Sequence, residues 1–459
     1  MVPAVALVAI VAEDQTVLRA APEESAPRPA ILWKGDWVEV RGRVHGYLSV
    51  YDHRHERAGY VAPERVREYE LDESTADRIW PVVEFLKDSK GDESLGIGMI
   101  ALFLRVAPTK RIDAGVFERL GSFAERLARR ASGSAPGETG DLARHLEVAA
   151  SYGVTFRALE LEGRSITCYD GEAFRRALAL GGSAIERARA ALALTDSRCF
   201  DPSQGVSSVA SLQAWVSEVL DEVDAGSLPA AIANRIHTRR GVVRAELAHW
   251  SARRLDASAA RTQYARAVES LKAVDETELF TDDRAAYDRA VVRVAAERWA
   301  GEAGSGAAGV RVTDRNPGET CIAVASGEGT FETCTYGFVW RSSIRMSAPG
   351  VVSLSVEPIP GWLELWVIAK SAAGYGVTAL VPAAVDPELG YVELAGWTPD
   401  GQRMLVAREF TQGVVVRREF SVVRLDTFDA EKSARSAKSL EAFRRFSSAD
   451  WRRSTFALR

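Results

Sequence analysis

The spacing of apolar and polar residues divides the chain into three regions. Short apolar runs separated by turn residues occupy residues 1–70, which predicts β-strands. Across residues 71–300 apolar side chains recur at intervals of three and four, the spacing of amphipathic helices. From residue 310 to 459 the period changes to two, which again predicts strands. We therefore predict a multidomain α+β protein whose domains are 1–70, 71–300 and 310–459.

The first region predicts a small closed β-barrel. Turn residues, among them Lys34-Gly35-Asp36 and Gly42–Gly46, separate its β-rich runs. A closed barrel leaves no strand edge exposed, which suits so short a segment. The five expected strands begin near Val17, Ile31, Trp37, Tyr47 and Ala58.

Several pieces of this region carry a recognisable pattern. They are the VLRAAP opening at Val17, the Lys34-Gly35-Asp36 turn followed by Val38 and Val40, the strand Gly46-Tyr47-Leu48-Ser49-Val50, and the closing Gly59-Tyr60-Val61. In these pieces Val17–Tyr69 resembles a bacterial SH3-type (SH3b) domain. The resemblance implies an SH3-like barrel that binds a cell-wall peptide or a protein partner in the bacterial envelope. Many family members have Trp where Tyr47 stands, so the ligand-facing surface is expected to differ here.

The aromatic residues of this region have two interpretations. A small barrel buries most of its large side chains, so core packing is the default. The alternative is a peptide groove formed by Trp33, Tyr51 or Tyr60, which are our candidate ligand-binding residues. His45, His53 and His55 are close in sequence, and His53 and His55 would share a strand face. We expect a polar hairpin tip rather than a metal site, because no carboxylate or thiol lies at ligand spacing.

The start of the chain and the cysteines bear on the compartment. Val2–Ala12 is apolar, with an A-x-A-like site at Ala4-Val5-Ala6 but no preceding positive residues. It predicts either a truncated signal peptide or the first strand of the barrel, and both hold if cleavage follows Ala6. The four cysteines form two local pairs. We expect disulfides in a periplasmic or secreted protein, the alternative being four free thiols in the cytosol. The expected disulfides are Cys168–Cys199 and Cys321–Cys334.

The central region predicts a helical bundle. Gly96-Ile97-Gly98 partly matches a phosphate-binding turn, but the full GxGxxG is missing and nucleotide binding is disfavoured. Pro81 fits the first turn of a helix. The glycine-rich segments Ser132–Gly140 and Gly301–Gly309 predict a loop and a joint. A set of arginines predicts a solvated helix face, with nucleic-acid binding as the weaker alternative. These are Arg239, Arg240, Arg244, Arg253 and Arg254.

The last region predicts antiparallel sheets, as a sandwich or as part of a propeller. The segment Ala395–Ala407 contains Thr398-Pro399-Asp400-Gly401, a tight hairpin turn. It resembles the blade hairpin of Tol-type periplasmic propellers, with Thr398 in place of Ser. The aromatic tail 440–459 is expected to dock on these sheets rather than remain in solvent. Its aromatic residues are Phe443, Phe446, Trp451 and Phe456.

Composition and the absence of catalytic motifs exclude several classes of function but do not identify a reaction. A net charge of −5 and a pI near 5.9 give no overall attraction to nucleic acid, and no apolar run is long enough to span a membrane. No GxSxG, HExxH or Walker A motif is present, and no cofactor is expected. We therefore predict a non-enzymatic binding or scaffold protein of the cell envelope. The alternative is an envelope hydrolase that its barrel targets to peptidoglycan.

Overall fold

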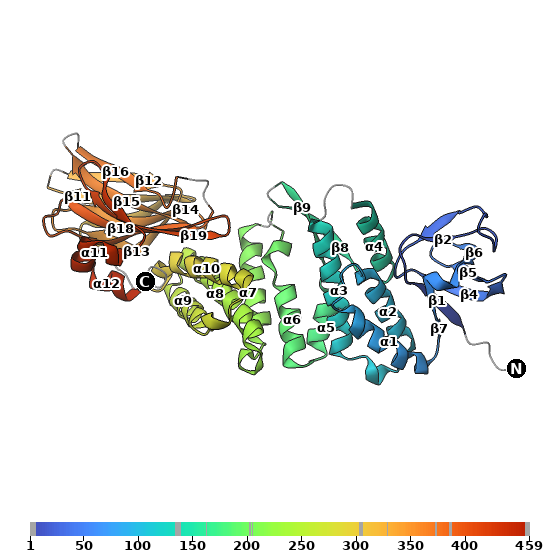
Figure 1. Cartoon of the computed structure of the whole chain (residues 1–459). Helices are drawn as coiled ribbons and strands as arrows, with labels where there is room; N and C mark the ends of the chain where they lie inside the picture. Colours follow the sequence, from blue (N-terminus) through green and yellow to red (C-terminus); the bar gives the residue numbers. More distant parts are fainter. Residues whose placement is uncertain are drawn as a thin grey trace. The chain divides into compact units, whose positions relative to one another are not determined.

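A computed structural model of the chain describes residues 6–133, 139–161, 163–201, 203, 205–302, 306–327, 329–371, 374–384 and 388–454. The chain forms two units, Met1–Gln204 and Gly205–Arg459 (Figure 1). The division between them falls inside the helical range 71–300. Parts of the two expected glycine-rich linkers, residues 134–138 and 303–305, lie outside the described residues.

Unit 1 begins with a five-stranded antiparallel sheet in the order β6-β5-β4-β1-β7. The apolar stretch near the N-terminus supplies the inner strand β1, between β4 and β7. A separate two-stranded ribbon, β2–β3, is joined to β6 by a bridge between Arg19 and Tyr60. The strands are β1 (Leu7–Val11), β2 (Thr16–Leu18), β3 (Ala30–Leu32), β4 (Trp37–Val44), β5 (Tyr47–Asp52), β6 (Arg57–Val61) and β7 (Val66–Glu70).

The expected closed barrel is not formed by strand pairing. Among the described residues, the paired strands run as an open path whose ends are β6 and β7. The ribbon covers the inner face of the sheet instead of completing the ladder, and Leu18 and Leu32 pack there with Leu48 and Val50. Side-chain packing between sheet and ribbon therefore buries this core, although the hydrogen-bonded ladder stays open.

Helices follow the sheet in unit 1. Asp72 caps the first of them by accepting a hydrogen bond from the Thr75 backbone N–H, as its position before the helix predicts. Pro81 lies inside this helix rather than in a first turn. Its ring faces solvent, where water can satisfy the carbonyl that a proline cannot bond. The elements are α1 (Glu73–Leu86), α2 (Glu93–Val106), α3 (Ala114–Gly133), α4 (Thr139–Ser151), the hairpin β8 (Phe156–Leu161) and β9 (Arg164–Tyr169), α5 (Glu172–Ala179) and α6 (Ala184–Leu194).

The N-terminal sheet and the helices of unit 1 share a core. Val8, Ile10 and Tyr69 of the sheet are buried in one cluster with apolar residues of α1, α2 and α3. Gly98 of α2 lies against the Lys34-Gly35-Asp36 turn, where an added Cβ would be 2.6 Å from the Gly35 carbonyl oxygen. The Gly96-Ile97-Gly98 segment is thus buried helix, and its Gly98 allows close packing with the sheet.

Unit 2 begins with a helical bundle. Two of the arginines expected on a solvated face are instead largely buried: the side chains of Arg240 and Arg244 are 13% and 15% exposed. Arg240 donates to backbone carbonyls at the end of α7, and Arg244 pairs with Asp221 at 2.5 Å. These arginines therefore join helices of the bundle. The helices are α7 (Val206–Asp221), α8 (Ala230–Arg253), α9 (Ala257–Lys272), α10 (Thr281–Ala296) and the 3-10 turn η6 (Arg298–Ala300).

Two sheets follow in unit 2. A three-stranded sheet packs through Ile322 and Val324 against an eight-stranded one that runs β13-β14-β15-β17-β18-β19-β20, with β16 on β15. The turn Thr398–Gly401 joins β17 to β18, as the Pro-Asp-Gly sequence predicts. The strands are β10 (Val310–Asn316), β11 (Glu319–Ser326), β12 (Gly329–Thr335), β13 (Phe338–Met346), β14 (Val352–Ile359), β15 (Trp362–Ser371), β16 (Gly374–Leu380), β17 (Gly390–Trp397), β18 (Arg403–Gln412), β19 (Val415–Arg424) and β20 (Ala430–Ala434).

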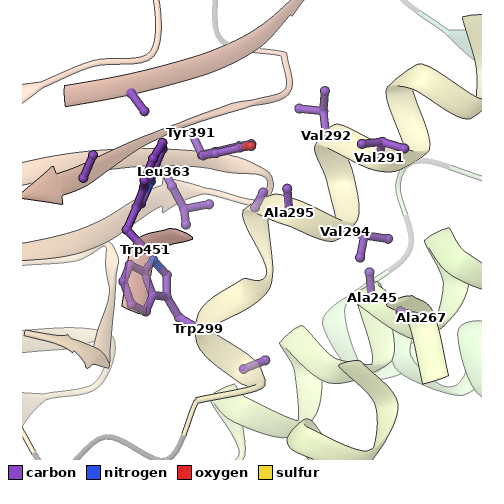
Figure 2. Close-up of a cluster of buried hydrophobic side chains, with 14 of the residues drawn as sticks. Ala245, Ala267, Val291, Val292, Val294, Ala295, Trp299, Leu363, Tyr391 and Trp451 are labelled. Atoms are coloured by element: carbon purple, nitrogen blue, oxygen red, sulfur yellow. The ribbon is translucent and has the colours of Figure 1, made fainter. Parts of the chain in front are cut away.

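Helices, sheet and C-terminal tail of unit 2 meet in one hydrophobic core. Figure 2 shows α10, with Val291 and Ala295, next to the strands that carry Leu363 and Tyr391. The tail forms the short helices α11 (Glu441–Phe446) and α12 (Ala449–Ser454). Phe443 and Trp451 are buried in the same core, so the expected docking of the tail is confirmed for them. Phe456 lies outside the described residues.

Candidate functional site

The structure separates the three candidate ligand-binding aromatics. Tyr51 and Tyr60 lie on neighbouring strands of the N-terminal sheet, β5 and β6. Trp33 follows β3 and packs edge-on against His145 of α4, with ring centres 5.9 Å apart. Trp33 therefore belongs to the contact between the sheet region and the helices. It does not belong to the face that carries the tyrosines.

Alternation along β5 and β6 places three tyrosines on one face of the sheet. On β5 Leu48, Val50 and Asp52 are buried, while Tyr47, Ser49 and Tyr51 are partly exposed. In the register of the two strands Tyr60 lies opposite Ser49, and Ala58 lies opposite Tyr51. Residues opposite each other share a face, and diagonal neighbours are within reach of aromatic side chains. We call Tyr47, Ser49, Tyr51, Ala58 and Tyr60 the tyrosine face.

Arg41 and His53 contact the Tyr51 ring. The guanidinium of Arg41 lies 4.0 Å from the ring centre, and the His53 ring contacts it edge-on at 4.8 Å. Glu39 accepts hydrogen bonds from Arg41 at 3.2 Å and His53 at 2.7 Å. These bonds hold the pKa of the Glu39 carboxyl below its usual range.

Two turns give the tyrosine face its register. His45 and Gly46 both have positive φ, the conformation of the two-residue turn that joins twisted antiparallel strands. In the next turn the buried Asp52 carboxylate accepts bonds from the backbone N–H groups of Arg54 and His55 and from the Arg57 side chain. Burial raises the pKa of Asp52, but its bonds to His55 and Arg57 outweigh this and lower it.

The three histidines of this region do not form a metal-ligand group. His45 occupies one hairpin turn, whereas His53 and His55 lie in the other turn rather than on a strand face. His53 Nε2 is 2.7 Å from Glu39, and His55 Nδ1 is 2.8 Å from Asp52. His53 and His55 thus each have their own carboxylate partner. We interpret these two pairs as supports for the turn at residues 53–56.

A second cluster of chemically active side chains is buried in unit 2. His249 of α8 lies between Glu297, which precedes η6, and Glu357 of β14, with its Nδ1 3.3 Å from an oxygen of each. All three side chains are at most 1% exposed. Glu357 also accepts bonds from Trp340 Nε1 at 3.1 Å and from the Gly361 backbone N–H at 2.6 Å.

The protonation of His249 determines the charge of this cluster. Burial lowers the pKa of His249, but the adjacent carboxylates of Glu297 and Glu357 more than compensate and raise it to about 9. The two carboxylates therefore stabilise the protonated imidazole, and a metal ion at this position would have to displace that proton. The cluster is a buried ionic contact between the helices and the sheet. A second group with ligand spacing, Glu319 with Cys321 and Cys334, has its sulfurs in a disulfide.

A further ion pair lies in the same interface. Arg298 of η6 is 2.9 Å from Glu393 of β17, and their side chains are 5% and 2% exposed. Trp451 of the tail donates its Nε1–H to the same Glu393 at 2.9 Å. Sequence reasoning missed both clusters, although Glu297-Arg298 interrupts an otherwise apolar run. That interruption is the signal that could have drawn attention to this interface.

Both expected disulfides are present. Cys168 of β9 is joined to Cys199, and Cys321 of β11 to Cys334 of β12. The first encloses the helices α5 and α6, and the second links paired strands at directly opposed positions. Two disulfides fit a protein that folds outside the reducing cytosol.

Two further findings bear on the interpretation of these sites. Within the described part of the chain, none of the helices is long and apolar enough to cross a bilayer. Comparison of the chain with protein-family models, curated proteins and solved structures gave no match. The geometry of the chain itself must therefore carry any functional proposal.

Proposed function

We propose that this chain is a non-catalytic binding or scaffold protein of the bacterial cell envelope, periplasmic or secreted, and that the tyrosine face contacts its partner. The observation that carries the proposal is the placement of Tyr47, Tyr51 and Tyr60 on one partly exposed face. Tyrosines supply large contact area at low entropic cost and are enriched at binding hot spots. The two disulfides favour the compartment.

The proposed partner is a peptide, a cell-wall polymer or a protein of the envelope. A sheet with an attached ribbon, and turns at Lys34-Gly35-Asp36 and His45-Gly46, fits the SH3-like resemblance from which this partner class comes. The hydrolase alternative has less support. Catalysis needs titratable groups that line an accessible cleft, and the His249 cluster and the Arg298–Glu393 pair do not meet that need because they are at most 5% exposed.

The test is quantitative binding of the full chain to purified peptidoglycan and to envelope proteins, first by sedimentation and then with the isolated partner. Tyr51→Ala and Tyr60→Ala are expected to weaken binding about tenfold each, a loss of about 1.4 kcal/mol that exceeds the ~1 kcal/mol most interface residues cost. The matched control is Tyr336→Ala, which removes an equally large side chain that is 76% exposed in unit 2. It should leave binding unchanged.

Trp33→Ala separates binding from folding. Because Trp33 packs against His145, its removal should lower the melting temperature of unit 1 more than it weakens binding. Equal affinities for the wild type, Tyr51→Ala and Tyr60→Ala would exclude the tyrosine face as the binding surface. Hydrolysis of peptidoglycan by the purified chain would favour the enzyme instead.

A further inference from the structure

The C-terminal tail of unit 2 encloses a hollow against the large sheet. It lies between β19, the segment that follows β20, and helices α11 and α12, and its volume is about 700 Å³. This is within the range of about 300–1,000 Å³ that is typical of small-molecule sites. We call this hollow the C-terminal pocket.

Three aromatic side chains form the base of the C-terminal pocket. Phe420 of β19 and Phe443 of α11 meet edge-to-face with ring centres 5.5 Å apart, and Phe443 meets Trp451 of α12 at 5.9 Å. The bond from Trp451 Nε1 to Glu393 fixes the indole. Each ring is at most 7% exposed, so the base is rigid and only a small part of each ring is open to a ligand.

The walls of the C-terminal pocket are strongly cationic. Among its lining residues, all of which the structure describes, none is acidic. Arg418 is held by the buried carboxylate of Glu409. Arg435, Lys438 and Arg444 have no carboxylate partner within the described part of the chain. The cationic side chains that line it are Arg418, Arg435, Lys438, Arg444 and Arg452.

Two arginines of α11 and α12 that do not line the pocket are paired with carboxylates. Arg445, next to Arg444 on α11, pairs with Glu441 at 3.0 Å, and Arg453 of α12 pairs with Asp450 at 2.5 Å. Neither of these two arginines lines the pocket. Cations that converge without counter-charge repel one another, and an anionic ligand removes that repulsion. The charge of the walls therefore selects for an anion.

We propose that the C-terminal pocket binds a small organic anion whose acidic group sits among Arg435, Lys438 and Arg444 and whose apolar body lies over the aromatic base. Arginine forks bond phosphate and carboxylate oxygens in pairs, and the stems of the long cationic side chains add apolar contact. The inference is independent of the tyrosine face, which lies in the other unit.

The probe is octyl phosphate, titrated below its micelle concentration into the full chain by isothermal calorimetry. We expect one site per chain, at least tenfold weaker binding of inorganic phosphate, and no binding of octyl glucoside, which has the same apolar chain without the charge. Affinity should fall as NaCl rises, because salt screens exposed charges. Equal binding of octyl phosphate and octyl glucoside, or no binding of octyl phosphate, would overturn the proposal.

Matched variants locate the site. Arg444→Gln should weaken octyl phosphate binding at least fivefold and Arg435→Gln/Arg444→Gln at least twentyfold, while Arg445→Gln and Arg453→Gln leave it unchanged. These residues are exposed, so little change in melting temperature is expected. The wild-type protein gives a second readout. Octyl phosphate should protect Arg435 and Arg444, but not Arg445, from modification by phenylglyoxal. Mass spectrometry of the modified protein measures this protection.

One competing occupant is the end of the chain itself, residues 455–459, which lie outside the described residues. A chain that ends at residue 454 tests this directly. If octyl phosphate binds the shortened chain but not the full one, the pocket holds its own C-terminus and the proposal is wrong. Equal binding by both chains supports an external ligand, as does selective loss in Arg444→Gln.

Discussion

Both units pack helices on a β-sheet through an apolar core, and unit 2 adds buried ion pairs to that core. In unit 1 the contact is apolar, with Val8 and Ile10 of the sheet packed among helical side chains. Its polar bonds include Lys34 to Asp92 at 2.8 Å, where both side chains are 24% exposed. In unit 2 the contact contains ionised groups that are sealed from water, among them His249 and Glu357. An apolar contact depends on shape, whereas an ionic one depends on complete pairing and on pH.

The strongest way to break the ionic contact is to remove Glu357. Glu357→Ala leaves the His249 cation with one carboxylate and leaves Trp340 Nε1 and the Gly361 N–H without their acceptor. Loss of one partner from a buried pair costs about 3–5 kcal/mol, and we expect that decrease in the free energy of unfolding of unit 2. Hydrogen exchange read by mass spectrometry follows the two units separately.

The control for this variant is Glu441→Ala, which removes an exposed carboxylate that pairs with Arg445. Surface pairs contribute about 0–1 kcal/mol, so unit 2 should keep its stability. Similar losses in Glu357→Ala and Glu441→Ala would show that the buried contact is not what holds unit 2 together. Protection of unit 1 should be the same in both variants.

Alkaline pH should weaken unit 2 by a somewhat smaller amount. The pKa of His249 is raised from about 6.5 in the unfolded chain to about 9 in the fold, so folding favours the proton. Its contribution is complete below pH 6.5 and is lost as the pH rises through 9, an effect of about 3 kcal/mol at most. Melting curves between pH 6 and 10 measure it. The variant His249→Gln should flatten the dependence in unit 2, and an unchanged slope would contradict the assignment.

The smallest expected loss of stability comes from overpacking the apolar contact of unit 1. Gly98→Ala places a methyl group 2.6 Å from the Gly35 carbonyl oxygen, which forces α2 away from the turn. Overpacking of this kind costs about 1–3 kcal/mol, and unit 2 should not respond. Gly42→Ala is the control, because no atom lies within 4 Å of its added Cβ. If Gly98→Ala is as stable as Gly42→Ala, the close approach of helix and turn is not required.

Local periodicity predicted where most helices and strands occur along the chain, but not which strand edges pair with one another. The period of two expected from residue 310 onwards corresponds to strands such as β15, and the tail aromatics Phe443 and Trp451 are buried as expected. The ladder of the N-terminal sheet was predicted as closed, because turn and strand patterns carry no information on which edges pair.

The sequence could not predict the candidate site in full. Alternation correctly separates Tyr51 from Val50 on β5, but Trp33 lies in a loop, where no period indicates which side it faces. The buried Glu357 was missed because residues 352–357 of β14 are buried on both faces. Sequence reasoning places a charged residue such as Glu357 on the solvent-exposed face of a strand. This part of β14 has no exposed face.

The Cys168–Cys199 bridge has a mechanical consequence. The bond joins β9 to the chain a few residues before Gly205, where unit 2 begins. Tension applied through the C-terminal half therefore passes through the sulfur atoms into β9, and α5 and α6 carry no load. The two cysteines are 31 residues apart in sequence, on the order of 100 Å of fully extended chain. While the disulfide is intact, this segment cannot extend under tension. Reduction would place α5 and α6 in the path of that tension.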